Sequence, residues 1–428
     1  MLETPLTLPC GSILPNRLCK AAMTEGLADS RNRPTMRHQT LYRRWAANGL
    51  GLQISGNIQI ERTALERAGN VVLDGQEDDA ALTALHAMTN AARRGGGHFW
   101  AQINHAGRQT PKAINPNPPA PSAVKPALPG GNFGQPRALA EDEILDLIDR
   151  FARAAETCRA HGFTGVQIHA AHGYLVSQFL SPRANIRTDA WGGSLENRAR
   201  FLLEIVRATR RVVGPDFPIS VKLNSADFQK GGFAFEDCLQ VVEWLNAERI
   251  DLLEISGGTY EQPSMMGLEG MLEPVLDSDK RESTRAREAY FTRYAAAVAK
   301  VAQMPLMVTG GFRTRAGMEA ALAEGSAHVI GLARPLCGAP DCAGPLLRGQ
   351  ADTLPSFEHQ LAMGRGWLGQ TSPFSIVRMI NGFGALGWCY EQIYRIADGL
   401  APDLKMGVFK AFRAYQATEA KAAKALQR

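Results

Sequence analysis

The sequence of 428 residues predicts a parallel (β/α)8 barrel, the TIM-barrel fold class of α/β proteins, followed by a helical C-terminal appendage. Short apolar runs alternate with amphipathic ones along most of the chain, as strands alternate with helices in such a barrel. Polar and glycine-rich residues follow the apolar runs, at the end of the barrel where its chemistry lies. We expect residues 1–345 to form the barrel and residues 346–428 to form the appendage.

Eight strands and the helices between them are expected in order. The strands are residues 17–23, 51–54, 98–103, 166–168, 218–223, 251–255, 305–309 and 328–332. The helices are residues 41–48, 79–93, 141–161, 236–247, 287–302 and 314–324, with one more that Ser194 caps. Residues 110–138 and 257–282 read as long loops, and loops of this length are usually functional. Eight strands, each followed by a helix or a long loop, favour a barrel over a doubly wound sheet.

Composition limits the classes of partner. The net charge of +5 is spread along the chain without a basic tract, which argues against a nucleic-acid partner and suits small anionic ligands. No apolar run approaches a membrane span, and the N-terminus lacks the regions of a signal peptide. Seven scattered cysteines have no CxxC spacing, which disfavours a zinc ribbon or clustered iron–sulfur ligation and suits a reducing cytoplasm. We therefore expect a cytoplasmic protein without a membrane partner.

Two stretches resemble a phosphate-binding site. Gly310 and Gly311 follow the seventh expected strand, and Ala333 and Arg334 follow the eighth. Glycines let backbone N–H groups approach an anion, and the arginine adds a permanently charged donor. Barrels place phosphate sites after these two strands, so we favour this interpretation over glycines that merely turn the chain.

A competing nucleotide motif lies near the C-terminus. Residues 382–387 satisfy G-x-G-x-x-G, and residues 375–380 before them could form a strand. Too little chain follows to complete a dinucleotide-binding half, and the tail after Leu404 reads as helical. We therefore expect a phosphorylated cofactor but no Rossmann domain.

The fourth strand ends at His169, and His172 and Tyr174 follow on a polar loop. The two histidines could bind zinc, with His105 as a third ligand. They could also be core histidines with satisfied hydrogen bonds. In a third interpretation they are neutral donors to a substrate oxyanion, with Tyr174 as the acid. Spacing alone does not decide between the metal and oxyanion roles.

The run HAAHGYLVSQFLSPRANIRTDAWGGSLENRARF, residues 169–201, closely resembles the signature of the old yellow enzyme family of FMN-dependent oxidoreductases. The resemblance extends in order over residues 1 to about 345. It includes the segments 15–17, 22–24, 102–108, 120–122, 310–311 and 333–334. It implies a (β/α)8 barrel with FMN at its C-terminal mouth, in agreement with the strand count.

The resemblance also implies roles for individual residues. Thr24 matches the donor to flavin O4, Gln102 matches the residue at the pyrimidine edge, and Lys222 stands where many members have arginine near N1. The lysine keeps the charge but loses the forked donor. Further positions match the flavin lining and the phosphate grip, namely Ala22, Met23, Gly56, Gly310, Gly311, Ala333 and Arg334. His169 and His172 match the pair that holds the activating oxygen of the substrate, and Tyr174 matches the proton donor.

The implied activity is an ene-reductase reaction. NADH or NADPH reduces FMN, and an α,β-unsaturated carbonyl or nitro compound then accepts hydride from flavin N5 and a proton from Tyr174. Alternatives on the same scaffold are a flavin demethylase or dehydrogenase and a single-domain enzyme similar to 2,4-dienoyl-CoA reductase. The chain departs from that last branch because Cys337 and Cys342 do not form its cysteine cluster. A non-redox aldolase using Lys222, or a non-catalytic flavin carrier, is a more distant alternative.

The appendage carries an apolar stripe on a basic helix, formed by Val408, Phe409, Phe412 and Tyr415. We expect this helix to dock on the barrel or on another subunit of a homo-oligomer. Binding to a membrane surface is the less favoured alternative.

Overall fold

The computed structural model describes residues 1–128, 131–256, 294–370 and 372–426. Eight parallel strands form a closed barrel, because β3 pairs with both β4 and β13. In barrel order they are β3 (Leu18–Lys20), β4 (Leu52–Gln59), β6 (His98–Asn104), β9 (Val166–Ala170), β10 (Ile219–Asn224), β11 (Leu252–Ser256), β12 (Leu306–Thr309) and β13 (Val329–Leu332). The predicted (β/α)8 fold class is confirmed.

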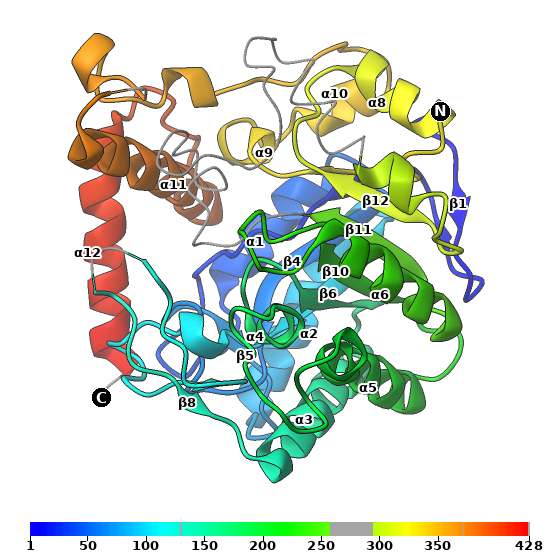
Figure 1. Ribbon diagram of the computed structural model, residues 1–428. Helices are drawn as coiled ribbons and strands as arrows, with labels where there is room; N and C mark the ends of the chain where they lie inside the picture. Colours follow the sequence, from blue (N-terminus) through cyan, green and yellow to red (C-terminus); the bar gives the residue numbers. More distant parts are fainter. Residues whose placement is uncertain (129–130, 257–293, 371, 427–428) are drawn as a thin grey trace.

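Helices lie around the barrel, as Figure 1 shows. They include α1 (Met36–Ala46), α2 (Asp79–Ala92), α3 (Glu141–Ala160), α4 (Leu175–Leu180), α5 (Leu195–Val213), α6 (Phe235–Ala247) and α8 (Arg315–Ala323). The expected cap of α5 is present, because the Ser194 hydroxyl accepts the Asn197 N–H at 3.3 Å. The expected loop at 257–282, with Tyr260, lies outside the described residues. Of the helix expected at 287–302, the described part is helical at residues 294–298.

The second strand differs from its prediction. It was expected to end at Ile54, but β4 continues to Gln59 across an irregularity in its pairing with β6. All eight residues of β4 are buried, including the polar side chains of Gln53, Ser55 and Asn57. Polar residues inside the barrel break the apolar pattern, so hydropathy alone does not reveal the full strand.

The G-x-G-x-x-G motif does not follow a strand, so the strand considered possible at residues 375–380 is not formed. Residues 375–380 are the first turns of α11 (Ser375–Ala397), and the glycines lie within the same helix. A Cβ at Gly384 would lie 2.3 Å from Cγ1 of Val408, and one at Gly387 would lie 3.0 Å from the Ala411 carbonyl oxygen. These glycines therefore allow α12 (Val408–Leu426) to pack closely on α11.

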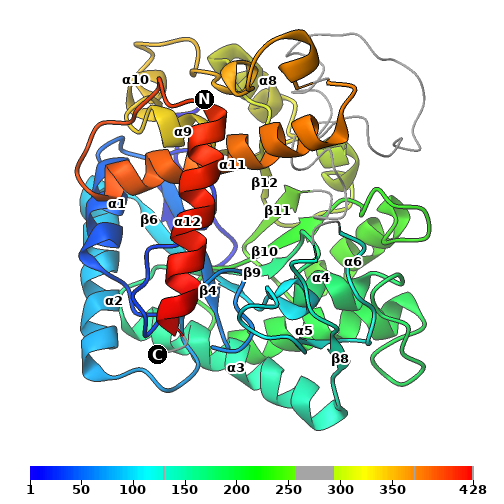
Figure 2. The ribbon, with the colours of Figure 1, turned by 90° about the vertical axis from the view of Figure 1, so that its left-hand side faces the viewer.

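The two C-terminal helices dock on the barrel of their own chain. Figure 2 shows α12 running across one face of the molecule, with α11 crossing behind it. The Arg37 side chain of α1 pairs with Asp398 at 2.6 Å and lies over the Tyr394 ring. Within the predicted stripe, Val408 is buried while Phe409 stays 52 % exposed. No helix in the described part of the chain is long and apolar enough to cross a membrane.

Two shorter helices, α9 (Pro335–Gly338) and α10 (Ala343–Leu347), connect the barrel to this appendage. Contact with the barrel continues past the predicted boundary at residue 345, since the Leu354 N–H donates to the Arg313 carbonyl at 2.7 Å. The two-residue strands β7 (Pro119–Ala120) and β8 (Arg137–Ala138) pair within the expected 110–138 loop.

Candidate active site

A connected set of polar side chains crosses the barrel interior. Lys222 and Glu254 form a buried ion pair, with Nζ 3.0 Å from Oε1. The amide of Gln167 donates to the other Glu254 oxygen at 2.8 Å, and Gln102 donates to Gln167 at 2.7 Å. Lys222 and Gln102, two of the predicted cofactor residues, are therefore joined through buried partners.

His169 and His172 lie together at the C-terminal end of β9, with ring centroids 5.1 Å apart. His169 is buried on the strand, whereas His172 is half-buried in a left-handed conformation with φ of 61°. Such a conformation is strained for a residue with a Cβ and clusters at functional sites. It is held by Asn224, which accepts the His172 N–H at 3.1 Å, and by Gln109, which donates to the His172 carbonyl at 3.1 Å.

Both imidazoles are neutral at neutral pH. Burial, then electrostatic interactions with His172 and Lys222, hold the pKa of His169 well below its usual value. Burial and the charge of Lys222 do the same to the pKa of His172. His169 Nδ1 accepts the Ala171 N–H at 3.2 Å, so the ring proton of the neutral His169 lies on Nε2. His172 Nε2 lies 2.7 Å from the Ser256 hydroxyl at the end of β11.

Tyr174 caps α4 beside these rings. Its ring centroid lies 4.9 Å from that of His169 in an edge-to-face arrangement, and its phenol hydrogen-bonds the Glu66 carboxyl. The Thr24 hydroxyl donates to the same carboxyl at 2.9 and 3.0 Å, and the Asn57 amide also donates to it. The structure therefore brings Thr24 and Tyr174 together through Glu66.

The loop after β3 places Ala22 and Met23 at the mouth, both half-buried. The Gly56 N–H donates to Glu25 at 2.8 Å, and a Cβ at Gly56 would lie 2.1 Å from the other Glu25 oxygen and 2.6 Å from the Met23 carbonyl oxygen. Glycine at this position thus allows β4 and the β3 loop to approach one another.

The residues expected to bind the FMN phosphate lie between β12 and α8 and directly after β13. Gly310 and Gly311 both have positive φ, 106° and 82°, and a Cβ at Gly310 would meet nothing within 4 Å. The Arg334 side chain is 59 % exposed, and its Nε lies 3.3 Å from Glu358 of the appendage. Burial opposes ionisation of Glu358, but the charges of Arg334 and Arg313 bring its pKa down to about 2. An open glycine turn beside two cations fits an anionic phosphate.

Among the described residues, the zinc interpretation lacks a third ligand. His105 Nδ1 accepts the Gly107 N–H at 3.0 Å, and His105 Nε2 lies 3.2 Å from Glu61. No group of three or more His, Cys, Asp or Glu side chains within the described ranges is arranged to hold a metal ion.

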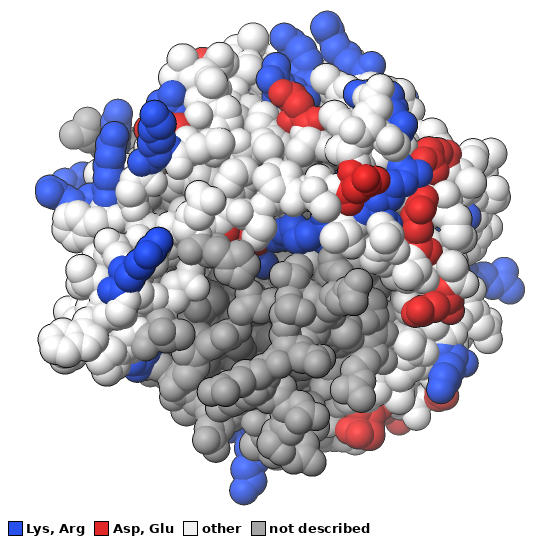
Figure 3. All heavy atoms as spheres, turned by 90° about the horizontal axis from the view of Figure 1, so that it is seen from above, with Lys and Arg blue, Asp and Glu red and all other residues white. Residues whose placement is uncertain are grey.

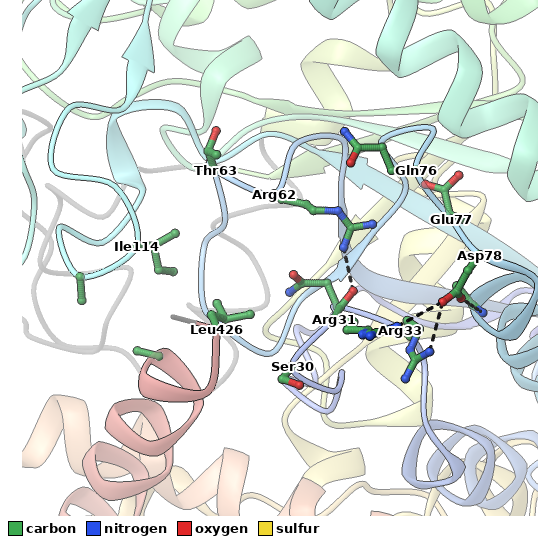
Figure 4. Close-up of a pocket in the computed structure, with 14 residues that line it drawn as sticks. Ser30, Arg31, Arg33, Arg62, Thr63, Gln76, Glu77, Asp78, Ile114 and Leu426 are labelled. Carbon is green, nitrogen blue, oxygen red and sulfur yellow. Dashed lines mark hydrogen bonds and ion pairs between the residues drawn. The ribbon is translucent and has the colours of Figure 1, made fainter. Parts of the chain in front are cut away.

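A separate surface hollow of about 460 Å³ lies beside the end of α12 (Figure 4). Its three arginines are already paired, Arg31 and Arg33 with Asp78, Arg33 also with Asp29, and Arg62 with Asp74. Figure 3 shows separate basic and acidic groups on the face seen from above, without a continuous basic tract over the described residues.

Sequence reasoning missed Glu66, Ser256 and Glu254. Glu66 lies in a polar segment after β4 that matches none of the motifs considered. Glu254 and Ser256 end the sixth strand, where the barrel rule places chemistry, so their position was a usable signal.

Residues 2–352 match the NADH:flavin oxidoreductase / NADH oxidase family. A NADH-dependent flavin oxidoreductase of Hypocrea jecorina is 38% identical over 349 residues, which cover 77% of this chain and 85% of the relative. The structure of the old yellow enzyme homologue from Zymomonas mobilis is similar with a TM-score of 0.67 and 27% identity, over 83% of this chain and 95% of that one. A 2-naphthoyl-CoA reductase structure is similar with a TM-score of 0.71 and 27% identity, over 81% of this chain and 52% of that one.

Proposed function

The chain belongs to the NADH:flavin oxidoreductase / NADH oxidase family, and we propose that within it the protein is an ene-reductase for α,β-unsaturated carbonyl or nitro compounds. It is a NADH-dependent flavin oxidoreductase of the old yellow enzyme group, with FMN as cofactor. The observation that carries the ene-reductase proposal is the cluster of two neutral imidazoles and a phenol at the end of β9.

The residues at the mouth suit FMN. Gly310, Gly311, Ala333 and Arg334 would hold the phosphate, where an open turn meets a charged side chain. Gln102, Lys222 and Thr24 would face the isoalloxazine ring, lined by Ala22, Met23 and Gly56. When bound, FMN supplies the two-electron chemistry between the reduced nicotinamide and the alkene.

The histidines bind and polarise the substrate in this proposal. His169 carries its proton on Nε2 and can donate it to a carbonyl or nitro oxygen. His172 can donate from Nδ1 when the Ser256 hydroxyl donates to Nε2. Because both rings are neutral, they stabilise the oxyanion as hydrogen-bond donors and do not give up a proton to it. Tyr174 then protonates the α-carbon.

The test is a single turnover of the NADH-reduced holoenzyme with a cyclic enone. We expect the enone to reoxidise the flavin and to be recovered as the saturated ketone, identified by mass spectrometry. Reoxidation by oxygen alone, with the enone recovered unchanged, would contradict the proposal. Reduction of the flavin by the saturated compound would instead favour a dehydrogenase that runs in the opposite direction.

A further inference from the structure

Glu66 lies at the centre of the candidate active site but has no role in the reaction proposed above. It lies on the segment between β4 and the short strand β5 (Val71–Val72), and its side chain is half-buried at the barrel mouth. Thr24, Asn57 and Tyr174 all hydrogen-bond its carboxyl. One carboxyl therefore connects the residue expected at flavin O4 with the expected proton donor.

The protonation state of Glu66 decides which way the Tyr174 proton points. A Glu66 carboxylate can only accept, so it holds the phenolic proton away from a substrate. A protonated Glu66 can donate to the phenol oxygen and leave the phenolic O–H free to point elsewhere. A tyrosinate formed beside a carboxylate would also meet an adjacent negative charge, whereas one beside a carboxylic acid would be stabilised.

The surroundings of Glu66 shift its carboxyl toward the protonated form, although its hydrogen bonds with Asn57, Thr24 and Tyr174 oppose that shift. Although the side chain keeps partial exposure, loss of hydration raises the pKa of Glu66 above its usual value, against the hydrogen bond from Asn57 and the charge of Arg67. Arg67 is bound by residues of the C-terminal appendage. Its Nε lies 3.1 Å from Glu419, and its guanidinium donates to the Tyr394 phenol at 2.7 Å.

Aromatic rings of the appendage also contact the Arg67 side chain. The Arg67 guanidinium lies 4.0 Å from the Tyr390 ring centroid and 5.4 Å from that of Tyr415, and Tyr390 and Tyr415 are stacked. Among the described residues, the titratable or charged groups facing Glu66 are Arg67, Tyr174 and Tyr415, with Glu419 behind Arg67 and His169 behind Tyr174. The positive charge of Arg67, which acts on Glu66, is thus balanced by Glu419 of α12.

We propose that Glu66 is a positioning residue that supplies the proton behind Tyr174, and that the C-terminal helices sustain this role by neutralising Arg67. The inference rests on the proposed function. Tyr174 gives its proton to the α-carbon, the O–H bond of Glu66 breaks, and that proton restores the phenol. Glu66 then regains a proton from solvent, so this proton relay takes up one solvent proton per turnover, while NADH supplies the hydride.

The experiment follows reoxidation of the NADH-reduced holoenzyme by an enone as a function of pH. In the native enzyme the rate constant should fall as pH rises through the raised pKa of Glu66, because the ionised carboxyl retains the phenolic proton. Glu66→Gln keeps a hydrogen-bonding amide but has no proton to transfer. It should be slower by about tenfold at low pH, within the range of general acid catalysis, and should lack the pH-dependent fall.

Two further variants test the linkage. Glu419→Gln leaves Arg67 positive and unbalanced, so the fall in rate should move to lower pH. Glu61→Gln alters a carboxyl of the same segment that pairs with His105 and should leave the profile unchanged. In a Tyr174→Phe background, Glu66→Gln should cause no further loss, since there is no phenol to restore.

The outcomes separate this inference from the proposed function. If the native enzyme does not reduce the enone, the proposed function fails first. If the native enzyme does so but Glu66→Gln retains the same pH profile, with rates equal or uniformly lowered, Glu66 is at most structural and the inference is overturned. The FMN absorption spectrum of each variant shows whether the holoenzyme is intact.

Discussion

His172 Nε2 and Ser256 Oγ lie 2.7 Å apart. His172 follows strand β9 and Ser256 ends strand β11, and β10 lies between these two strands. This contact orients one of the two imidazoles expected to bind an oxyanion. Because His172 also has a strained backbone, its ring position depends on contacts from several strands.

Ser256→Ala should weaken the binding of a phenolate, an anion that stacks on the flavin and gives a long-wavelength charge-transfer band. Loss of one neutral hydrogen bond costs about 0.5–1.5 kcal/mol, or roughly two- to tenfold in affinity. Replacing both His169 and His172 with Ala should abolish the band while FMN stays bound. Ser225→Ala is the matched control, since the Ser225 hydroxyl is buried with no hydrogen-bond partner among the described residues. A full band in the double variant would remove the histidines from the ligand site.

Tyr174→Phe should separate the two half-reactions. Reduction of FMN by NADH needs no proton donor at the nicotinamide, so its stopped-flow rate should stay almost unchanged. Reoxidation by an enone should slow by at least about tenfold, because general acid catalysis typically contributes 10²–10⁴-fold. Nitroalkenes serve as the internal control and should be affected less, since a nitronate is stable enough to be protonated in water. An unaltered enone rate would mean that another group is the acid.

The Lys222–Glu254 pair should influence the reduction potential of the flavin. Glu254→Gln keeps the shape but removes the charge that balances Lys222, so the flavin reduction potential should rise by about 30 mV or more, equivalent to about 1.4 kcal/mol. Lys222→Ala leaves a buried carboxylate unpaired and should cost about 3–5 kcal/mol of folding free energy. The double variant Lys222→Met/Glu254→Gln is the control for that cost and should recover most of the stability. An unchanged potential in Glu254→Gln would place Lys222 away from the flavin.

Arg334 and Glu358 should affect FMN affinity in opposite directions. Arg334→Ala removes a charge-assisted contact worth about 1.5–3 kcal/mol, or roughly ten- to a hundredfold in the dissociation constant. Glu358→Gln removes a negative charge 3.3 Å from Arg334 and should tighten binding. Fluorescence titration of the apoprotein with FMN measures both. Equal affinities in Arg334→Ala and the native chain would mean that Arg334 lies outside the phosphate grip.

Acid should weaken the fold through buried histidines. Burial lowers the pKa of His38 to about 4 from an unfolded value near 6.5, and its Nδ1 accepts the Thr35 N–H at 3.0 Å. As pH falls through 6.5 the unfolded chain therefore gains a proton that the folded chain does not, which costs about 3 kcal/mol once pH reaches 4.

The free energy of unfolding in urea, measured at several pH values with FMN constant, checks this expectation. His38→Gln should reduce the decline between pH 6.5 and 4, whereas His86→Gln, at an exposed position on α2, should not. The carboxyls of Glu61 and Glu358 have pKa values of about 2 in the folded chain. The stability that they provide is therefore lost as pH falls further, toward 2. A decline of equal size in His38→Gln would contradict the assignment.

The sequence by itself determined the barrel, its strand order and the polar ends of its strands. These features depend on neighbouring residues. Apolar runs mark where each strand lies, although not its full length in β4, and His169, His172 and Tyr174 lie within six residues of one another. The tertiary structure decided the pairings of Tyr174 with Glu66, Lys222 with Glu254 and Arg334 with Glu358. It also showed that the glycines of residues 382–387 serve helix packing. Barrel closure and docking of the appendage set these contacts between residues far apart in sequence, and no local pattern encodes the distance between them.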